Sequence, residues 1–104
     1  MMSNEQHLLL KLIEECAEVQ QRASKYMQFG GQETQTGHID DNTTRLVMEI
    51  NDLICTIALL SEENILPTPN ADDLRAWYER KVEKIEKYRR YSQELGYVEG
   101  ARNA

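Results

Sequence analysis

The sequence predicts an all-α fold with three main helices. Glycine and proline are scarce, at 5 and 2 of 104 residues, while Leu, Glu, Ile and Lys dominate. Few residues therefore break helices. Apolar residues also recur with the 3.6-residue period of a helix in three separate stretches. A chain of this length forms one ordinary domain, so we expect residues 1–104 to fold as a single helical domain.

The first predicted helix runs from about Asn4 to Met27. It is followed by Phe29-Gly30-Gly31, where glycine can adopt the positive φ angle that ends many helices. One face of this helix is apolar, as expected for a helix that packs against a core. The residues of that face are Leu9, Leu12, Ile13, Cys16, Val19, Ala23 and Met27.

A polar loop is predicted for residues 30–42, GGQETQTGHIDDN. It contains three glycines and has no helical or strand period. A loop of this length in a small domain is often functional or mobile. Two alternatives stay open, a lid over a binding site and a plain disordered connection.

The second predicted helix starts near Asn42 or Thr43, either of which can cap it, and continues to about Glu63. It is apolar almost all round, which predicts a central, buried helix. A chain with three helices has little else to cover it, so burial by a second subunit is indicated. The main stripe is Leu46, Val47, Ile50, Leu53, Ile54, Ile57 and Leu60, with Met48, Cys55, Ala58 and Leu59 on other sides.

The third predicted helix follows a turn with two prolines, ILPTP at residues 65–69. Its start is capped by the segment Asn70 to Asp73, and it runs to about Leu95 before Gly96. We expect residues 99–104 to be a frayed end. The apolar stripe consists of Leu74, Trp77, Tyr78, Ile85, Tyr88 and Leu95.

Charge and composition exclude several classes of function. The net charge is −6, which disfavours nonspecific nucleic-acid binding. No apolar run reaches the roughly 18 residues of a membrane span. The first residues lack the basic lead-in and cleavage site of a signal peptide, and Cys16 and Cys55 fit reduced core thiols. We therefore expect a cytoplasmic protein with no membrane or nucleic-acid partner.

The charge is also unevenly distributed. Residues 75–90 contain seven Lys/Arg and three Glu, so this segment is +4 and the remainder is −10. An acidic part and a basic part suit a metal ion and an anionic ligand bound between them.

Two pairs of carboxylates carry the strongest chemical signal. Glu15 and Glu18 lie three residues apart on the first helix, and Glu49 and Asp52 are spaced in the same way on the second. Residues three apart share a helix face, so the pairs can converge on one point. Four converging carboxylates repel unless a divalent cation compensates them. Oxygen ligands favour Mg²⁺, with Mn²⁺ as a possible substitute, while Ca²⁺ is less favoured and zinc is disfavoured without His or Cys.

Each carboxylate pair also has a structural alternative. Glu14 alone fits a solvated surface residue. The pair on the first helix could face solvent and form salt bridges with Arg22 and Lys25. The pair on the second helix is harder to explain in this way, because polar residues are rare on so apolar a helix. The two pairs together favour the metal hypothesis.

A lysine interrupts the apolar stripe of the third helix. Lys81 lies between Tyr78 and Ile85, and a lysine on such a face needs an anion nearby. That anion could be a carboxylate of the protein or a bound phosphate, and both stay open. Lys84 lies at the edge of the stripe near Tyr88, where a surface role is favoured.

A family resemblance rests on two motifs. EECAE (Glu14 to Glu18) followed by EIND (Glu49 to Asp52) fits the pattern EExxE…ExxD, and this resembles the MazG-like, all-α nucleoside triphosphate pyrophosphohydrolases from about Leu8 to Leu95. The resemblance implies Mg²⁺ bound by Glu15, Glu18, Glu49 and Asp52. It implies hydrolysis of a nucleoside triphosphate to the monophosphate and pyrophosphate. It also implies a homodimer or tetramer, in which helices from two chains complete a four-helix-bundle-like core and site.

The mechanism that the resemblance implies is metal-assisted attack by water. Glu15 or Glu18 would accept the proton of the water. Lys81, with Lys25 as a weaker candidate and Lys84 beside it, would offset the charge of the phosphates. Two features depart from the family pattern: a gap of 30 residues from Glu18 to Glu49, which holds the glycine loop, and Asn51 where glycine is frequent.

Two other classes of function are weighed against the hydrolase. A di-iron carboxylate bundle also uses inward Glu residues but needs Glu-x-x-His pairs, which neither His7 nor His38 supplies. A non-catalytic helical dimerisation or regulatory module, which binds metal or nucleotide without turnover, is the main alternative. The sequence leaves the preferred base and sugar open.

Overall fold

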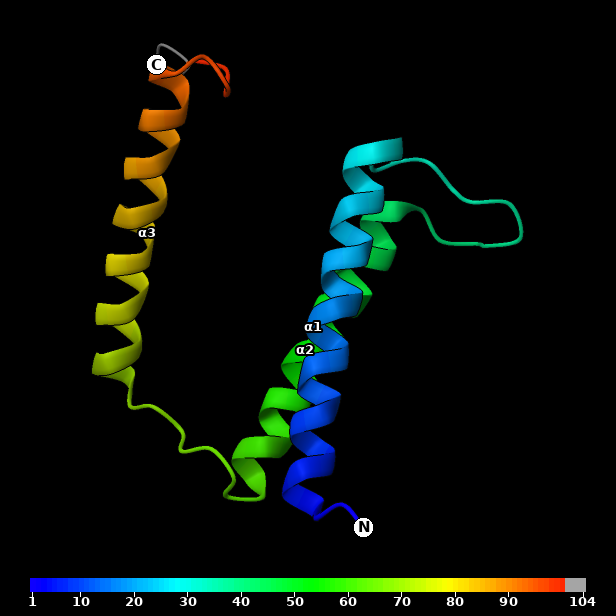
Figure 1. The fold of residues 1–104 in the computed structure, drawn as a ribbon, viewed down its shortest axis with the longest axis vertical. Helices are drawn as coiled ribbons and strands as arrows, with labels where there is room; N and C mark the ends of the chain where they lie inside the picture. The colour runs from blue at the N-terminus through cyan, green and yellow to red at the C-terminus, as the bar shows by residue number, and fades with distance from the viewer. Residues whose placement is uncertain (101–104) are drawn as a thin grey trace. The chain divides into compact units, whose positions relative to one another are not determined.

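The computed structural model describes residues 1–100, which contain three α-helices and no strand (Figure 1). They are α1 (Asn4–Phe29), α2 (Asn42–Glu62) and α3 (Ala71–Glu94). The predicted all-α class is confirmed, and the predicted helices agree with the observed ones within two residues at each end. The expected frayed end at 99–104 lies mostly outside the described residues.

The chain divides into two compact units. Met1–Pro67 holds α1 and α2, and α3 belongs to the second unit, which begins at Thr68. The expectation of a single domain stays a prediction. No helix within residues 1–100 combines the length and apolar character needed to cross a bilayer.

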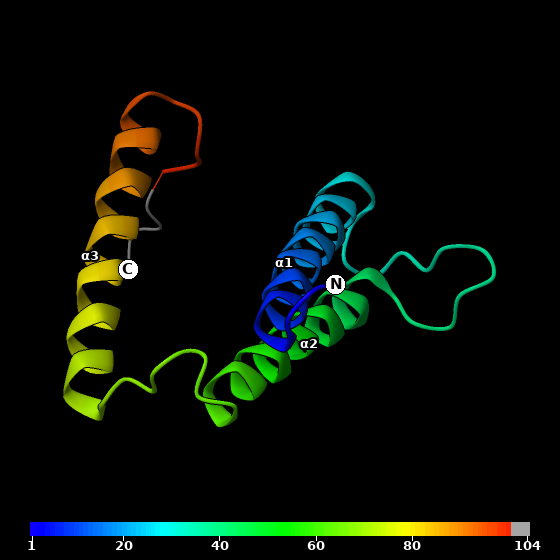
Figure 2. The same ribbon diagram turned by 60° about the horizontal axis from the view of Figure 1, so that its bottom comes forward.

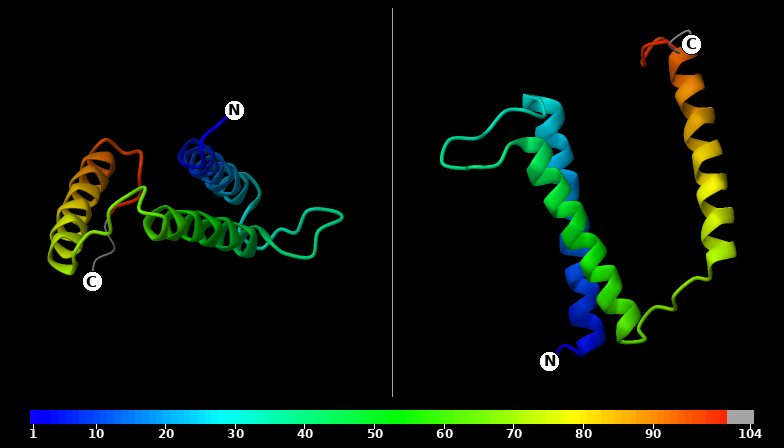
Figure 3. Two further views of the ribbon diagram at one scale, coloured as in Figure 1. Left: turned by 90° about the horizontal axis from the view of Figure 1, so that it is seen from below. Right: turned by 180° about the vertical axis from the view of Figure 1, so that it is seen from behind.

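The first unit is an antiparallel pair of helices (Figures 2 and 3). At one end, Nδ2 of Asn4 donates a hydrogen bond of 2.7 Å to Oε1 of Glu63. At the other end, Nδ2 of Asn42 donates one of 2.9 Å to the carbonyl oxygen of Gly30. These two contacts join the start of each helix to the end of the other, and they fix which turns of α1 and α2 face one another.

The helix caps explain where each helix begins. Ser3 caps α1 through a reciprocal capping box with Gln6. The predicted cap of α3 is confirmed, because the side chain of Asn70 accepts a hydrogen bond from the N–H of Asp73. The prediction for α2 was wrong by one or two residues, since Asp41 is its cap and accepts from the N–H of Thr44 at 2.8 Å. Asn42 is already helical, and its side chain bonds to the loop instead.

The apolar contact between α1 and α2 is modest. Leu60 is the one fully buried apolar residue within residues 1–100, at 0% exposure. The prediction that α2 is buried is not met within a single chain, because Val47 and Ile54 are 59% and 57% exposed. Their face of α2 has no cover from α1. The predicted stripes supply the half-buried residues of the contact, which include Leu9, Leu12, Val19, Ala23, Leu46 and Leu53.

Helix α3 has no buried residue. Its predicted apolar stripe is present on the helix but exposed, with Leu74 at 51% and Ile85 at 47%. Isolated helices of this length are marginal in water, because most helix stability comes from packing an apolar face.

The two ends of loop 30–42 are bonded to each other at its base, while its middle projects away from the helix pair (Figure 1). The N–H and hydroxyl of Thr43 both donate to the carbonyl oxygen of Gly31 at 3.0 Å, and the N–H of Asn42 donates to that of Glu33 at 3.1 Å. Gly31 permits this approach, since a Cβ there would lie 2.5 Å from Oγ1 of Thr43 and 2.6 Å from the ring of Tyr26. The hypothesis that this loop is a lid stays a prediction.

Gly31→Ala is therefore expected to destabilise the helix pair by about 1–3 kcal/mol, the usual cost of overpacking. Chemical denaturation followed by circular dichroism measures the loss of unfolding free energy. Gly100→Ala is the matched control, because a Cβ at Gly100 meets nothing within 4 Å. Equal stability of the two variants would contradict the proposed role of Gly31.

Candidate metal centre

Three of the four predicted ligands converge. Glu15 and Glu18 of α1 and Glu49 of α2 each place a carboxylate oxygen within 4.8 Å of the other two. The i,i+3 spacing puts the first two on one face of α1, and the antiparallel packing brings Glu49 opposite them. Glu18 is exposed, while Glu15 and Glu49 are half-buried. The cluster therefore lies at the edge of the contact between the helices, open to an ion from solvent.

Two oxygens of this cluster lack a partner. Oε2 of Glu15 and Oε2 of Glu49 are buried, and neither accepts a hydrogen bond within residues 1–100. Burying a carboxylate oxygen without a donor is costly. A cation placed among the three carboxylates would satisfy both oxygens, so the residues present fit a bound divalent ion. All-oxygen ligands suit Mg²⁺ or Mn²⁺.

Two pKa values in the cluster are raised, and repulsion among its negative charges contributes to both. Partial burial raises the pKa of Glu15 most, and the negative charges of Glu18 and Asp52 add to the effect. Hydrogen bonding with Glu18 is the main cause that raises the pKa of Glu49, followed by partial burial and by the charges of the other three acids. In the metal-free fold, both groups resist ionisation.

Asp52, the fourth predicted ligand, lies near the cluster but outside the group of three. Its side chain is exposed on α2, one turn from Glu49. Its charge still acts on Glu15 and Glu49, whose pKa values it raises. Direct ligation by Asp52 stays a prediction.

The surface alternative for the first pair is not observed. Neither Arg22 nor Lys25 forms an ion pair with Glu15 or Glu18 within residues 1–100. Glu14 is the acid of this segment that behaves as a surface residue. It is exposed and pairs with Lys11 at 3.0 Å.

The predicted substrate-binding lysines lie in different surroundings. Lys25 is half-buried on α1, with Nζ 5.5 Å from the centre of the Phe29 ring. Lys81 and Lys84 are exposed on α3, in the second unit. The role of each lysine stays a prediction.

Two small cavities contain residues that sequence analysis missed. Glu49 lines one of about 140 Å³ with His38, Asp40 and Arg45 from the loop and the start of α2. Arg22 lines a second of about 250 Å³ near the end of α1. Sequence periodicity does not reveal either cavity, because both depend on where the loop lies.

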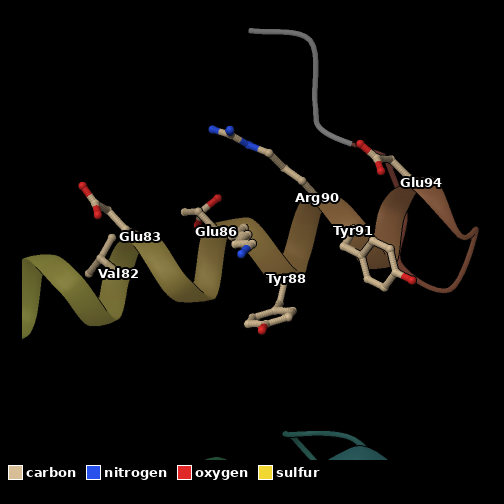
Figure 4. Close-up of a pocket in the computed structure, with 8 residues that line it drawn as sticks. Val82, Glu83, Glu86, Tyr88, Arg90, Tyr91 and Glu94 are labelled. Atoms are coloured by element: carbon tan, nitrogen blue, oxygen red, sulfur yellow. The ribbon is translucent and has the colours of Figure 1, made fainter.

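A larger hollow of about 800 Å³ runs along α3 (Figure 4). Its walls are side chains of one helix, among them Val82, Tyr88 and Tyr91. Figure 4 shows these side chains projecting from α3. It is therefore an open surface rather than a site with converging polar groups.

Comparisons with protein-family models, with curated proteins and with solved structures find no match. The family resemblance of the two motifs thus stays a prediction.

The raised pKa values predict how charge removal affects stability. An acid whose pKa is higher in the folded than in the unfolded state destabilises the fold once pH rises above its ordinary value. Glu49→Gln should therefore raise the melting temperature in EDTA at pH 7, with the gain vanishing near pH 4. The same variant should lose the stabilisation that millimolar Mg²⁺ or Mn²⁺ gives the wild type.

Thermal unfolding between pH 4 and 8 tests both effects. Glu14→Gln is the control, since Glu14 lies one residue from Glu15 but pairs with Lys11 in solvent. A lower melting temperature for Glu49→Gln in EDTA, or an undiminished response to metal, would contradict the candidate centre.

Proposed function

We propose that this protein is a Mg²⁺-dependent nucleoside triphosphate pyrophosphohydrolase. It cleaves a ribo- or deoxyribonucleoside triphosphate to the monophosphate and pyrophosphate, as in the MazG-like family that its motifs resemble. The observation that supports this most is the convergence of Glu15, Glu18 and Glu49 from two helices, with two buried oxygens that lack a partner. A cation would satisfy such a cluster, and a bound cation in turn attracts phosphates.

The proposed ligands are Glu15, Glu18 and Glu49, with Asp52 beside them. A divalent ion bound there supplies a Lewis acid for the phosphate oxygens and lowers the pKa of water. Mg²⁺ is the expected ion, and Mn²⁺ can replace it.

The side chains of the protein supply the remaining chemistry. Glu15 or Glu18 accepts the proton of the attacking water. Lys81, with Lys25 as a weaker candidate and Lys84 beside it, offsets the negative charge of the triphosphate and of the departing pyrophosphate. Direct attack by water requires no covalent intermediate. This agrees with the absence of a Ser/His/Asp arrangement from the sequence.

A homodimer with a four-helix core is part of the proposal. Val47 and Ile54 on α2 are more than half exposed, and α3 buries none of its apolar stripe. Exposed apolar faces of this extent mark interaction surfaces. A second copy of the chain would cover them and supply the two further helices.

The main alternative is a non-catalytic dimerisation or regulatory module. The same exposed apolar residues support it, because they indicate assembly whether or not the carboxylates turn over a substrate. Metal-dependent turnover separates the two functions.

Turnover is tested with a panel of ribo- and deoxyribonucleoside triphosphates and Mg²⁺, with the products resolved by chromatography. We expect monophosphate and pyrophosphate, and no turnover in EDTA. Glu49→Gln should lower kcat/KM by at least about 100-fold, since losing even an outer partner of a metal ligand costs 10–100-fold. Glu14→Gln is again the control. A folded protein that turns over no nucleotide with either metal would favour the regulatory module.

Assembly is tested by placing a charge on the exposed face of α2. Ile54→Asp should shift the protein from dimer or tetramer to monomer in analytical ultracentrifugation, because an unpaired carboxylate in an apolar interface is strongly unfavourable. Ile39→Asp makes the same change in the loop, where Ile39 is 96% exposed, and should leave the assembly intact. A wild-type monomer at micromolar concentration would contradict the dimer.

A further inference from the structure

A cavity of about 250 Å³ lies where the end of α1, loop 30–42 and the start of α2 meet. It is smaller than the roughly 300–1,000 Å³ of pockets that enclose drug-sized ligands. This volume suits one heterocyclic ring system better than a whole nucleotide. The cavity is lined by Arg22, Lys25, Phe29, Glu33, Gln35 and Asn42.

Arg22 is a buried cation without a partner. Its residue exposure is 9%, and it forms no hydrogen bond or ion pair within residues 1–100, although Glu33 lines the same cavity. A guanidinium group carries five N–H donors, and those of Arg22 are not among the fully buried polar atoms that lack a partner, so they are accessible at the cavity. The cavity therefore presents strong donors that a ligand with an acceptor oxygen would satisfy.

Asn42 and Glu33 supply acceptors to the same cavity. Asn42 is 3% exposed, and its Nδ2 donates to the carbonyl oxygen of Gly30 and, at 2.7 Å, to Oε2 of Glu33. These bonds use both N–H groups of the amide and orient it. Oδ1 of Asn42 accepts no hydrogen bond within residues 1–100, and a carboxylate such as that of Glu33 can accept several.

Lys25, which lies over Phe29, and the exposed Gln35 are further donors at this cavity. The remaining polar groups are one donor group, Arg22, and two acceptor groups, Glu33 and Asn42. The Watson–Crick edge of guanine presents the complement, a carbonyl oxygen followed by an N–H and an NH₂. Adenine has no carbonyl oxygen, and the edges of cytosine and uracil each present two acceptors and one donor. The exposed ring of Phe29, which Lys25 overlies at 5.5 Å, adds an aromatic wall on which a base can stack.

The cavity also lies next to the carboxylates along α1. Glu15, Glu18, Arg22, Lys25 and Phe29 are spaced by three or four residues, so they follow one face of the helix. Arg22 is one turn from Glu18, about 6 Å along the axis at 1.5 Å per residue. A nucleotide whose phosphates lie at the carboxylates can therefore place its base toward Gly30.

We infer that this cavity binds the base of the substrate and selects guanine, with Arg22 donating to the carbonyl oxygen and Glu33 and Asn42 accepting from the ring N–H and the amino group. The inference rests on the proposed function for the identity of the ligand as a nucleotide. Its test does not depend on hydrolysis, because a nucleoside carries the base without any phosphate.

The experiment titrates guanosine, adenosine, cytidine and uridine into the ¹⁵N-labelled protein in EDTA and follows the amide shifts. Guanosine should bind at least about tenfold more tightly than adenosine, since a site built to hydrogen-bond a group discriminates strongly against its absence. The shifts should centre on residues 22–42. Undetectable binding of guanosine, or equal binding of adenosine, would overturn the inference.

Variants test the two polar walls separately. Arg22→Gln and Glu33→Gln should each weaken guanosine binding at least about tenfold. Arg89→Gln, the same change at an exposed arginine paired with Glu86, should not affect it. Because Arg22 is buried, the affinity of Arg22→Gln is interpreted only if its amide spectrum shows a folded protein. If this variant does not fold, the loop variant Glu33→Gln tests the inference. Unchanged affinity in a folded variant would refute the assigned contact.

Hydrolysis assays separate this inference from the proposed function. Guanosine binding without turnover of any triphosphate would refute the hydrolase and keep the base site. Turnover at equal kcat/KM for GTP and ATP would refute the base site and keep the hydrolase.

Discussion

Repulsion among three carboxylates is the constraint on which the first unit depends. Glu15, Glu18 and Glu49 lie within 4.8 Å of one another, and two of their oxygens are buried without a donor. Hydrogen bonds at the two ends of the helix pair hold the turns that carry these acids opposite one another. Partial burial raises the pKa of Glu15 and hydrogen bonding with Glu18 raises that of Glu49, and the neighbouring negative charges add to both shifts. A cation at the cluster would relieve this repulsion.

The polar stripe of α1 orders the proposed chemistry along one line. Two acids are followed by two cations and then by Phe29, at spacings that keep all five on one face. In the proposed site, the metal lies at the two acids, and Arg22 and Phe29 face the base. The base of loop 30–42 lies at the far end of this line, where Thr43 bonds to Gly31 and Asn42 to Glu33. The glycine loop thus shapes a wall of the cavity as well as linking the helices.

The fold and part of the site follow from sequence patterns, and the rest depends on contacts that patterns do not encode. The helical period of the apolar residues and the capping residues located all three helices. The i,i+3 spacing of the acids predicted that those of α1 meet Glu49. The burial of Arg22 was not predictable, because a charged residue on a polar face gives no sign that a loop from beyond Gly30 will cover it. The cap at Asp41 was missed for a related reason. Asn42 and Thr43, which follow Asp41, are also residue types that cap helices. The side chain of Asn42 instead bonds to the loop, and Asp41 is the cap.

The metal centre and the proposed assembly have separate physical origins. All three converging carboxylates and every residue of the base cavity belong to the first unit, so one chain supplies them. The exposed apolar residues of α2, by contrast, are the basis of the proposed assembly. Val47 and Ile54 are 59% and 57% exposed, and covering the rest of each would contribute about 1 kcal/mol or more. Contact with a second copy would therefore stabilise the pair of helices and offset the repulsion among its carboxylates.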